Sequence, residues 1–153
     1  MTPAGGTSGL LVAAQFALAA GVLVPGRSFD WQPAGLLLAA GGAGLGLWAL
    51  TANRPGNFRI VPELKPGAHL VQSGPYRWIR HPMYTAVLLA TLGGLLCQWT
   101  PLRLLDFLAL GAVLYAKAVR EERLLSVRFP GYAAYQARTR RFLPGGQRAH
   151  KPR

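Results

Sequence analysis

Residues 73–96 read SGPYRWIRHPMYTAVLLATLGGLL, and they join a basic, proline-containing segment directly to a long apolar run. His81 precedes Pro82. A residue before proline is biased away from the helical conformation, whereas proline itself suits the first turn of a helix. The sequence therefore predicts that a helix begins at Pro82, with Arg77, Arg80 and His81 at its entrance.

Composition places this helix in a membrane protein. The chain has 153 residues, the size of one domain, and 51% of them are hydrophobic while only 14% are charged. We expect an all-α integral membrane protein with four transmembrane helices, at about 9–25, 34–52, 82–99 and 101–118. Only the second approaches the ~20 uncharged residues of a full span. Four buried helices of a soluble bundle are the alternative, which the shortage of charged residues disfavours.

The basic residues predict the orientation. Of 17 lysines and arginines, five lie between the second and third spans and ten lie from Lys117 onward, against two near the other connections. By the positive-inside rule, the long loop, the tail and both termini face the cytoplasm, and the protein lies in the cytoplasmic membrane. The net charge of +12 is better explained by an anionic lipid surface than by nucleic acid, because no stacking platform is evident.

Two further features favour packing over chemistry. The single cysteine, Cys97, lies in an apolar run, and the three histidines show no metal-binding spacing, so we expect no metal. The glycine-rich segment 41–46 lies within an uncharged span, where small residues let helices approach closely. A soluble nucleotide-binding turn would instead follow a strand.

Outside the spans, the chain divides into three segments of one domain, 1–153. Residues 53–74 are rich in proline and glycine and read as a cytoplasmic loop long enough to fold over a site. Residues 119–144 form a C-terminal helical region. We expect the tail, 145–153, to be disordered.

The fourth span leads into two adjacent carboxylates, Glu121 and Glu122, among basic residues. A surface ion-pair cluster is one interpretation. The other is a binding site, because the helix start at Pro82 favours an anionic group while the carboxylates favour a cation. Such a site suits a zwitterion with an additional positive charge, for which S-adenosylmethionine is an example.

Four motifs, in this order, resemble those of the isoprenylcysteine carboxyl methyltransferase family and its wider relatives, the phospholipid methyltransferases. They are LVQSGPYRWIRHPMY at 70–84, EERLL at 121–125, FPGYAAY at 129–135 and RFLP at 141–144. The resemblance covers about half of the chain, and the first two spans match only in hydropathy. It implies an integral membrane methyltransferase whose pocket for S-adenosylmethionine, formed by the loop and the C-terminal region, lies at the cytoplasmic face. It also implies a lipophilic acceptor that enters from the bilayer.

On these motifs the resemblance implies roles for individual residues. The cofactor-binding candidates are Leu70, Val71, Gly74, Tyr76, His81, Pro82, Tyr84, Glu121 and Glu122. The substrate-binding candidates are Arg77, Arg80, Tyr132, Tyr135 and Arg141. The catalytic candidates are Lys117 and Glu122.

Lys117 departs from the family pattern, which has an arginine five residues before the second glutamate. A lysine keeps the charge but loses the planar grip on a carboxylate. No histidine other than His81 lies in the motifs, and His81 is assigned to the cofactor, so no general base is evident. We therefore expect Lys117 to stabilise an anionic oxygen and rank a lipophilic carboxylate or phenol first as acceptor, with S-adenosylhomocysteine as the second product. A phospholipid amine or a small thiol stays open as the acceptor. A nicotinamide-dependent enzyme like the sterol reductases and a non-enzymatic membrane protein are the other classes.

Overall fold

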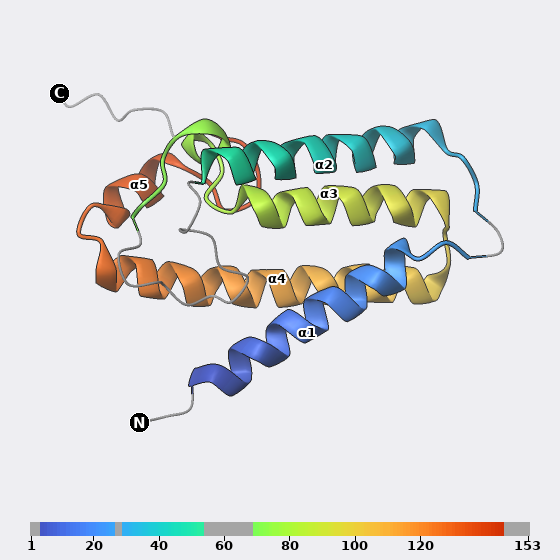
Figure 1. Ribbon diagram of the computed structural model, residues 1–153, viewed down its shortest axis with the longest axis horizontal. Helices are drawn as coiled ribbons and strands as arrows, with labels where there is room; N and C mark the ends of the chain where they lie inside the picture. The colour runs from blue at the N-terminus through green and yellow to red at the C-terminus, as the bar shows by residue number, and fades with distance from the viewer. Residues whose placement is uncertain (1–3, 27–28, 54–68, 146–153) are drawn as a thin grey trace.

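The computed structural model describes residues 4–26, 29–53 and 69–145, and these residues are helical with no strand (Figure 1). Five α-helices and one 3₁₀ helix, η1, follow one another along the chain. Their bounds are α1 Ala4–Leu23, α2 Pro33–Ala52, η1 Gly74–Arg77, α3 Pro82–Cys97, α4 Pro101–Arg128 and α5 Tyr132–Arg138. The predicted all-α fold is confirmed for this part of the chain. Most of the predicted loop (residues 54–68) and of the predicted disordered tail (146–153) lies outside the described residues.

The four long helices run alternately up and down (Figure 1). α2 packs chiefly on α3, while α1 crosses α4 at a slant and contacts α3 less extensively. The N-terminus of α3, the C-terminal ends of α2 and α4, η1 and α5 gather at one end, which we call the site end. The end of α1 and the start of α2 lie at the other, with the α3–α4 turn.

Glycines allow α2 and α3 to pack closely. A Cβ added to Gly42 would lie 2.6 Å from the backbone nitrogen of Ala90 and 2.7 Å from the carbonyl oxygen of Ala86. By contrast, a Cβ on Gly41 or Gly44 would meet nothing within 4 Å. The packing interpretation of the glycine-rich segment is therefore confirmed for Gly42, because only a residue without a side chain fits so near the α3 backbone.

At the end opposite the site, polar contacts connect α1 to α4. The guanidinium of Arg103 donates to the carbonyl oxygens of Val22 at 2.5 Å and Val24 at 2.9 Å. These carbonyls belong to the end of α1, where no further helical turn satisfies them. Gln98 accepts a hydrogen bond from the backbone N–H of Gly26 at 2.5 Å. Together these contacts fix where α1 ends relative to α4.

The helix bounds agree with the predicted spans at α2 and α3, and His81 is the N-cap residue of α3, with Pro82 first in the helix, as predicted. α4 continues to Arg128, well beyond the predicted end of the fourth span at 118. Its 28 residues make it about 42 Å long at 1.5 Å per residue. The extra turns carry Glu121 and Glu122 out to the site end.

Much of the molecular surface is apolar. Within the described residues, α2 is the one helix that is long and apolar enough to cross a membrane, while the apolar helices Ser8–Leu23 and Pro82–Cys97 are shorter. The predicted count of four spans therefore stays a prediction. Large apolar side chains such as Leu37, Leu102 and Leu108 are exposed on the helices. An apolar exterior of this kind suits lipid better than water.

Candidate active site at the end of the helical bundle

The motif that precedes α3 turns sharply at Gly74. This residue has φ of +57°, in the left-handed region, where L side chains are disfavoured. A Cβ here would also lie 2.7 Å from the Cβ of Ala52 at the end of α2. Gly74 therefore both turns the chain into η1 and lets η1 pack against α2.

Backbone hydrogen bonds then join the motif to the C-terminal segment. Arg80 N–H donates to the carbonyl oxygen of Arg140 at 2.8 Å, and His81 N–H donates to that of Arg141 at 3.1 Å. Ile79 and Arg140 form a parallel bridge. These contacts bring two of the four motifs, 60 residues apart in the sequence, into one structure.

Glu122 is the centre of the polar cluster at this end. Its Oε1 accepts hydrogen bonds from Arg80 Nε at 3.0 Å and Arg141 Nε at 3.0 Å, and lies 3.1 Å from His81 Nε2. Its Oε2 accepts from Arg141 Nη2 at 2.7 Å and Gln136 Nε2 at 3.2 Å. Burial alone would raise the pKa of Glu122, but the hydrogen bonds from His81, Arg141 and Arg80 outweigh it and hold the pKa well below its usual range. The carboxylate is thus ionised and surrounded by protein donors.

Arg80 also connects this centre to α5. Its Nη1 donates to the carbonyl oxygens of Gln136, at 3.0 Å, and of Thr139. Both carbonyls lie at the C-terminal end of α5, where a cation is favourable. Only 10% of the Arg80 side chain is exposed. The guanidinium therefore joins α3, α4 and α5 inside the protein.

His81 lies between the two adjacent glutamates. Its Nε2 faces Glu122, and its Nδ1 lies 3.5 Å from Oε2 of Glu121. The ring stacks on Tyr84, with centroids 5.2 Å apart and planes 4° from parallel. Burial opposes a charge on this imidazole, yet hydrogen bonding to Glu121 and Glu122 outweighs burial and raises the pKa of His81. The geometry therefore favours the imidazolium.

Glu121 differs from its neighbour because about a third of its side chain, 31%, is exposed. It accepts a hydrogen bond from the hydroxyl of Tyr84 at 3.1 Å. Burial would raise the pKa of Glu121, but His81, Tyr84 and the nearby charge of Lys117 lower it. Glu121 is an ionised carboxylate with one side accessible to a ligand.

Lys117 lies one helical turn before Glu121 and is almost completely buried, with 1% exposed. Its ammonium lies 5.3 Å from the centre of the Tyr84 ring, within the range of a cation–π contact. It also donates a hydrogen bond to Oε1 of Gln15 in α1. Three helices, α1, α3 and α4, therefore surround this cation.

The tyrosines of α5 form the other side of the site. The hydroxyl of Tyr135 donates to the carbonyl oxygen of Tyr76 at 2.7 Å, which holds α5 against η1. Burial raises the pKa of Tyr135 to about 12 and, assisted by the charge of Glu121, raises the pKa of Tyr76 above its ordinary value. Both phenols are neutral at physiological pH. Tyr132 is completely buried, and within the part of the chain that the structure describes its hydroxyl has no hydrogen-bond partner.

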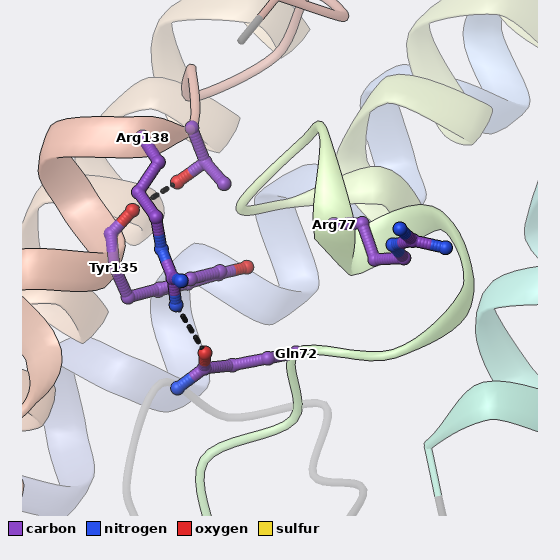
Figure 2. Close-up of a pocket in the computed structure, with 5 residues that line it drawn as sticks. Gln72, Arg77, Tyr135 and Arg138 are labelled. Carbon is purple, nitrogen blue, oxygen red and sulfur yellow. Dashed lines mark hydrogen bonds between the residues drawn. The ribbon is translucent and has the colours of Figure 1, made fainter. Parts of the chain in front are cut away.

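A polar pocket of about 190 Å³ opens between the chain before η1 and α5 (Figure 2). It is lined by Gln72, Arg77, Tyr135, Arg138 and Thr139. Figure 2 shows Arg138 reaching across from α5 to Gln72, and this hydrogen bond is 2.6 Å long. Of the two arginines, Arg138 directs its guanidinium into this pocket, where it can bind an anion such as a carboxylate or a phosphate. The guanidinium of Arg77 extends away from Arg138 and lies over the Trp78 ring, 5.6 Å from its centre (Figure 2).

The structure thus brings most of the predicted site residues to one end of the bundle. His81, Tyr84, Glu121 and Glu122 form one connected cluster, which Arg80 and Arg141 join through Glu122. Arg77 and Tyr135 line the separate pocket. Leu70 and Val71 are half-buried in the irregular chain before η1, and their apolar side chains take no part in the polar cluster.

Two residues of the cluster escaped sequence reasoning. Gln136 lies four residues after Tyr132 and carries no recognisable signal, since glutamine is common on helix surfaces. Gln15 did carry a signal, because it is an amide in the otherwise apolar run from Leu10 to Val24. Placing a polar side chain in such an apolar segment costs free energy, so the residue is a candidate for a functional role.

Metal binding receives no support from side-chain grouping. Across residues 4–26, 29–53 and 69–145, no three or more histidine, cysteine, aspartate or glutamate side chains are grouped so that they could hold a metal ion.

The profile of the phospholipid methyltransferase family matches residues 31–130, well over half of the chain, and the chain belongs to this family of membrane methyltransferases. The resemblance seen in the motifs is thereby confirmed. The matched segment includes α2 to α4 and leaves α1 and α5 outside.

The chain is also similar to the cobalt-zinc-cadmium resistance protein CzcN of Cupriavidus metallidurans. The two are 43% identical over 77 residues, which cover 49% of this chain and 35% of that protein. The chain thus matches only about a third of that relative's length.

Proposed function

We propose that this protein is an S-adenosylmethionine-dependent methyltransferase of the cytoplasmic membrane that methylates a lipophilic acceptor. The main support is the position of two opposite charges on α4. Glu121 is an ionised and partly exposed carboxylate, and the buried cation of Lys117 lies one helical turn before it. Family membership supports methyl transfer. The carboxylate of Glu121 supports a positively charged cofactor, and the ammonium of Lys117 supports an anionic acceptor.

The residues present fit the proposed cofactor. Glu121 offers a carboxylate for the cofactor's positively charged group, and the guanidinium of Arg138 at the pocket suits the cofactor's carboxylate. Tyr76 borders the pocket, because its carbonyl oxygen accepts a hydrogen bond from the hydroxyl of Tyr135. When bound, S-adenosylmethionine supplies a methyl group activated by its sulfonium sulfur.

Glu122 has a different proposed role from the one first inferred. Because its two oxygens already accept from Arg80, Arg141 and Gln136 and face His81, we assign it to positioning. It holds His81 beside Glu121 and connects α4 to the C-terminal segment. Arg80 and Arg141 are then positioning residues too, and Glu121 takes the place of Glu122 in contact with the cofactor.

On the acceptor side, Lys117 holds and stabilises an anionic oxygen. The ammonium is buried among α1, α3 and α4, so an acceptor reaches it only where these helices separate. A lipophilic carboxylate or phenolate therefore ranks first as the acceptor. A phospholipid amine is the second candidate, and the family's own description favours it.

The proposed topology has four spans with both termini in the cytoplasm. Exposed tryptophans support it, since these side chains prefer the membrane interface. Trp31 and Trp99 are 73% and 60% exposed beside the start of α2 and the end of α3. Trp48 and Trp78, exposed by 47% and 43%, lie near the site end with ring centroids 5.9 Å apart. The α1 and α3 spans are short, and bilayer thinning can accommodate them.

Two measurements test this function. Calorimetry on the purified protein in detergent should show binding of S-adenosylmethionine and S-adenosylhomocysteine. Stabilisation by NADPH alone would instead favour a reductase, and no binding of any of the three would favour a non-enzymatic protein. Glu121→Gln should lose affinity, while Arg123→Gln, an exposed change on the same helix turn, should retain it.

Membranes from expressing cells, incubated with methyl-labelled S-adenosylmethionine and then extracted, identify the acceptor. Base-labile label in lipid indicates a methyl ester, and base-stable label in a lipid without phosphorus indicates a phenol ether. Label in derivatives of phosphatidylethanolamine would replace the first-ranked acceptor with the second.

A further inference from the structure

Gln15 is a polar residue buried in the middle of an apolar helix. It is 8% exposed, whereas its neighbour Phe16 is 55% exposed on the outer face of α1. Its Oε1 accepts a hydrogen bond from the ammonium of Lys117 on α4. A buried amide in a span is costly, so its contact with the buried ammonium of Lys117 requires an explanation.

The contact fixes the position of a flexible side chain. A lysine has four rotatable bonds and a single point charge, so its helix alone leaves the ammonium many positions. Here Tyr84 of α3 provides a ring face on one side, and Gln15 of α1 provides an acceptor on another. The amide oxygen thereby restricts the ammonium to the space between the three helices.

α1 itself is held firmly enough to serve this purpose. At the opposite end of the bundle, Arg103 of α4 donates to the carbonyl oxygens of Val22 and Val24. The two helices are therefore joined by polar contacts at two levels, at Arg103 and at Lys117. Movement of α1 along α4 would break both.

We propose that Gln15 is a positioning residue for methyl transfer, which holds the ammonium of Lys117 against the acceptor oxygen. This inference rests on the proposed function. It also gives α1 a part in the active site, although this helix lies outside the segment that the family profile matches. The lysine that replaces the family's arginine would then use an acceptor on α1 to gain the orientation that a guanidinium has by its planar shape.

A merely structural role for Gln15 predicts different behaviour. In that case the loss of Gln15 would lower thermal stability, and cofactor affinity and the rate of methyl transfer would fall with it. A positioning role predicts a loss confined to the rate of transfer, with cofactor affinity and folding retained. It also predicts that Gln15 has no effect once Lys117 is removed.

The experiment compares Gln15→Met, which is similar in volume but has no oxygen acceptor, with Gln15→Glu, which keeps one. The probe is a set of vesicles made from lipids extracted from the expressing cells, with labelled S-adenosylmethionine at saturation. We expect Gln15→Met to lower the maximal rate about tenfold, the effect of one lost hydrogen bond at the reacting group, with affinity for S-adenosylmethionine within about twofold of wild type. Gln15→Glu should recover part of the rate. In a Lys117→Ala background, Gln15→Met should produce no further loss.

A second readout does not depend on activity. Reductive methylation followed by mass spectrometry measures the reactivity of Lys117 against Lys151, which serves as the internal reference in the same chain. Gln15→Met should raise the relative modification of Lys117 several-fold. An unchanged reactivity, a wild-type rate in Gln15→Met, or an additive loss in the Lys117→Ala background would overturn the inference alone. A wild-type protein that transfers no methyl group to any lipid would instead overturn the proposed function, and with it any catalytic role for Gln15.

Discussion

Nε2 of His81 lies 3.1 Å from Oε1 of Glu122, although the two residues are 41 positions apart in the sequence. This contact connects the start of α3 to the extended end of α4, and Arg80 and Arg141 converge on the same carboxylate. Glu121 and Glu122 therefore differ in their surroundings despite their adjacency. One carboxylate holds the protein together at the site end, and the other remains accessible.

The first prediction separates these two glutamates. Glu122→Gln should destabilise the protein by about 3–5 kcal/mol, because it leaves two arginines and an imidazolium around a neutral group. Glu121→Gln should cost only ~1 kcal/mol, since its side chain is 31% exposed. Thermal unfolding in detergent, followed by a fluorescent thiol or tryptophan probe, measures both.

Cofactor affinity should show the reverse order. Glu121→Gln should weaken binding of S-adenosylmethionine about tenfold or more, because a charged contact is lost. If Glu122→Gln keeps its stability but loses the cofactor, the division of roles between the two residues is wrong.

The second prediction concerns pH. His81 has a raised pKa in the folded protein, so its stabilising contribution is complete below its unfolded value of about 6.5 and is lost as pH rises through the folded pKa. The melting temperature should fall as the pH rises above about 6.5 and through the folded pKa of His81. His81→Gln, which cannot titrate, should be less stable at pH 6 and should show a flatter profile. Equal slopes in the two proteins would assign the pH dependence to other groups.

The third prediction tests the acceptor side. Lys117→Ala should slow methyl transfer while leaving affinity for S-adenosylmethionine nearly unchanged, because the ammonium contacts Gln15 and Tyr84 and is assigned to the acceptor. Lys117→Arg keeps the charge and should retain part of the rate. Single-turnover assays and calorimetry on the same preparations make the comparison, and loss of cofactor binding in Lys117→Ala would place this residue on the other side of the site.

The fourth prediction uses two glycines of the same helix. Gly42→Ala should destabilise the protein by about 1–3 kcal/mol, because its Cβ would lie 2.6 Å from the α3 backbone. Gly44→Ala meets nothing within 4 Å and should be neutral or slightly stabilising, since alanine favours helix. Melting temperatures in detergent should therefore separate the two variants, and equal values would show that α2 and α3 do not pack as described.

The fifth prediction is the topology. In a Cys97→Ser background, a cysteine at Gln32 should react with an impermeant thiol reagent on intact cells. A cysteine at Gln72, on the site end, should react only after the cells are opened. Both positions are exposed, so burial does not explain a difference. The opposite pattern would place the site outside the cytoplasm.

Local residue chemistry was sufficient to predict the bounds of α2 and α3, whereas α1 begins at Ala4, before the predicted start at 9, and α4 continues to Arg128, beyond the predicted end at 118. Pro82 after His81 marks the start of α3, and uncharged runs mark α2 and α3 because apolar residues must be removed from water or placed in lipid. The motifs likewise predicted that most of the site residues belong to one site. These features depend on neighbours in the chain, so a single sequence contains them.

The sequence by itself determined the helical class, the starting points of α2, α3 and α4, the glycine-rich segment that lets α2 approach α3, and the residues that carry charge. Only the tertiary structure decided how those charges are used. The motif before α3 pairs with residues 140–141, which directs Arg80 and Arg141 onto Glu122 and leaves Glu121 partly exposed. The slant of α1 across α4 brings Gln15 to Lys117, 102 residues away. The physical reason is that the charge state and the accessibility of a carboxylate or an ammonium depend on the groups that desolvate and neutralise it. Those groups come from helices that are distant in the chain.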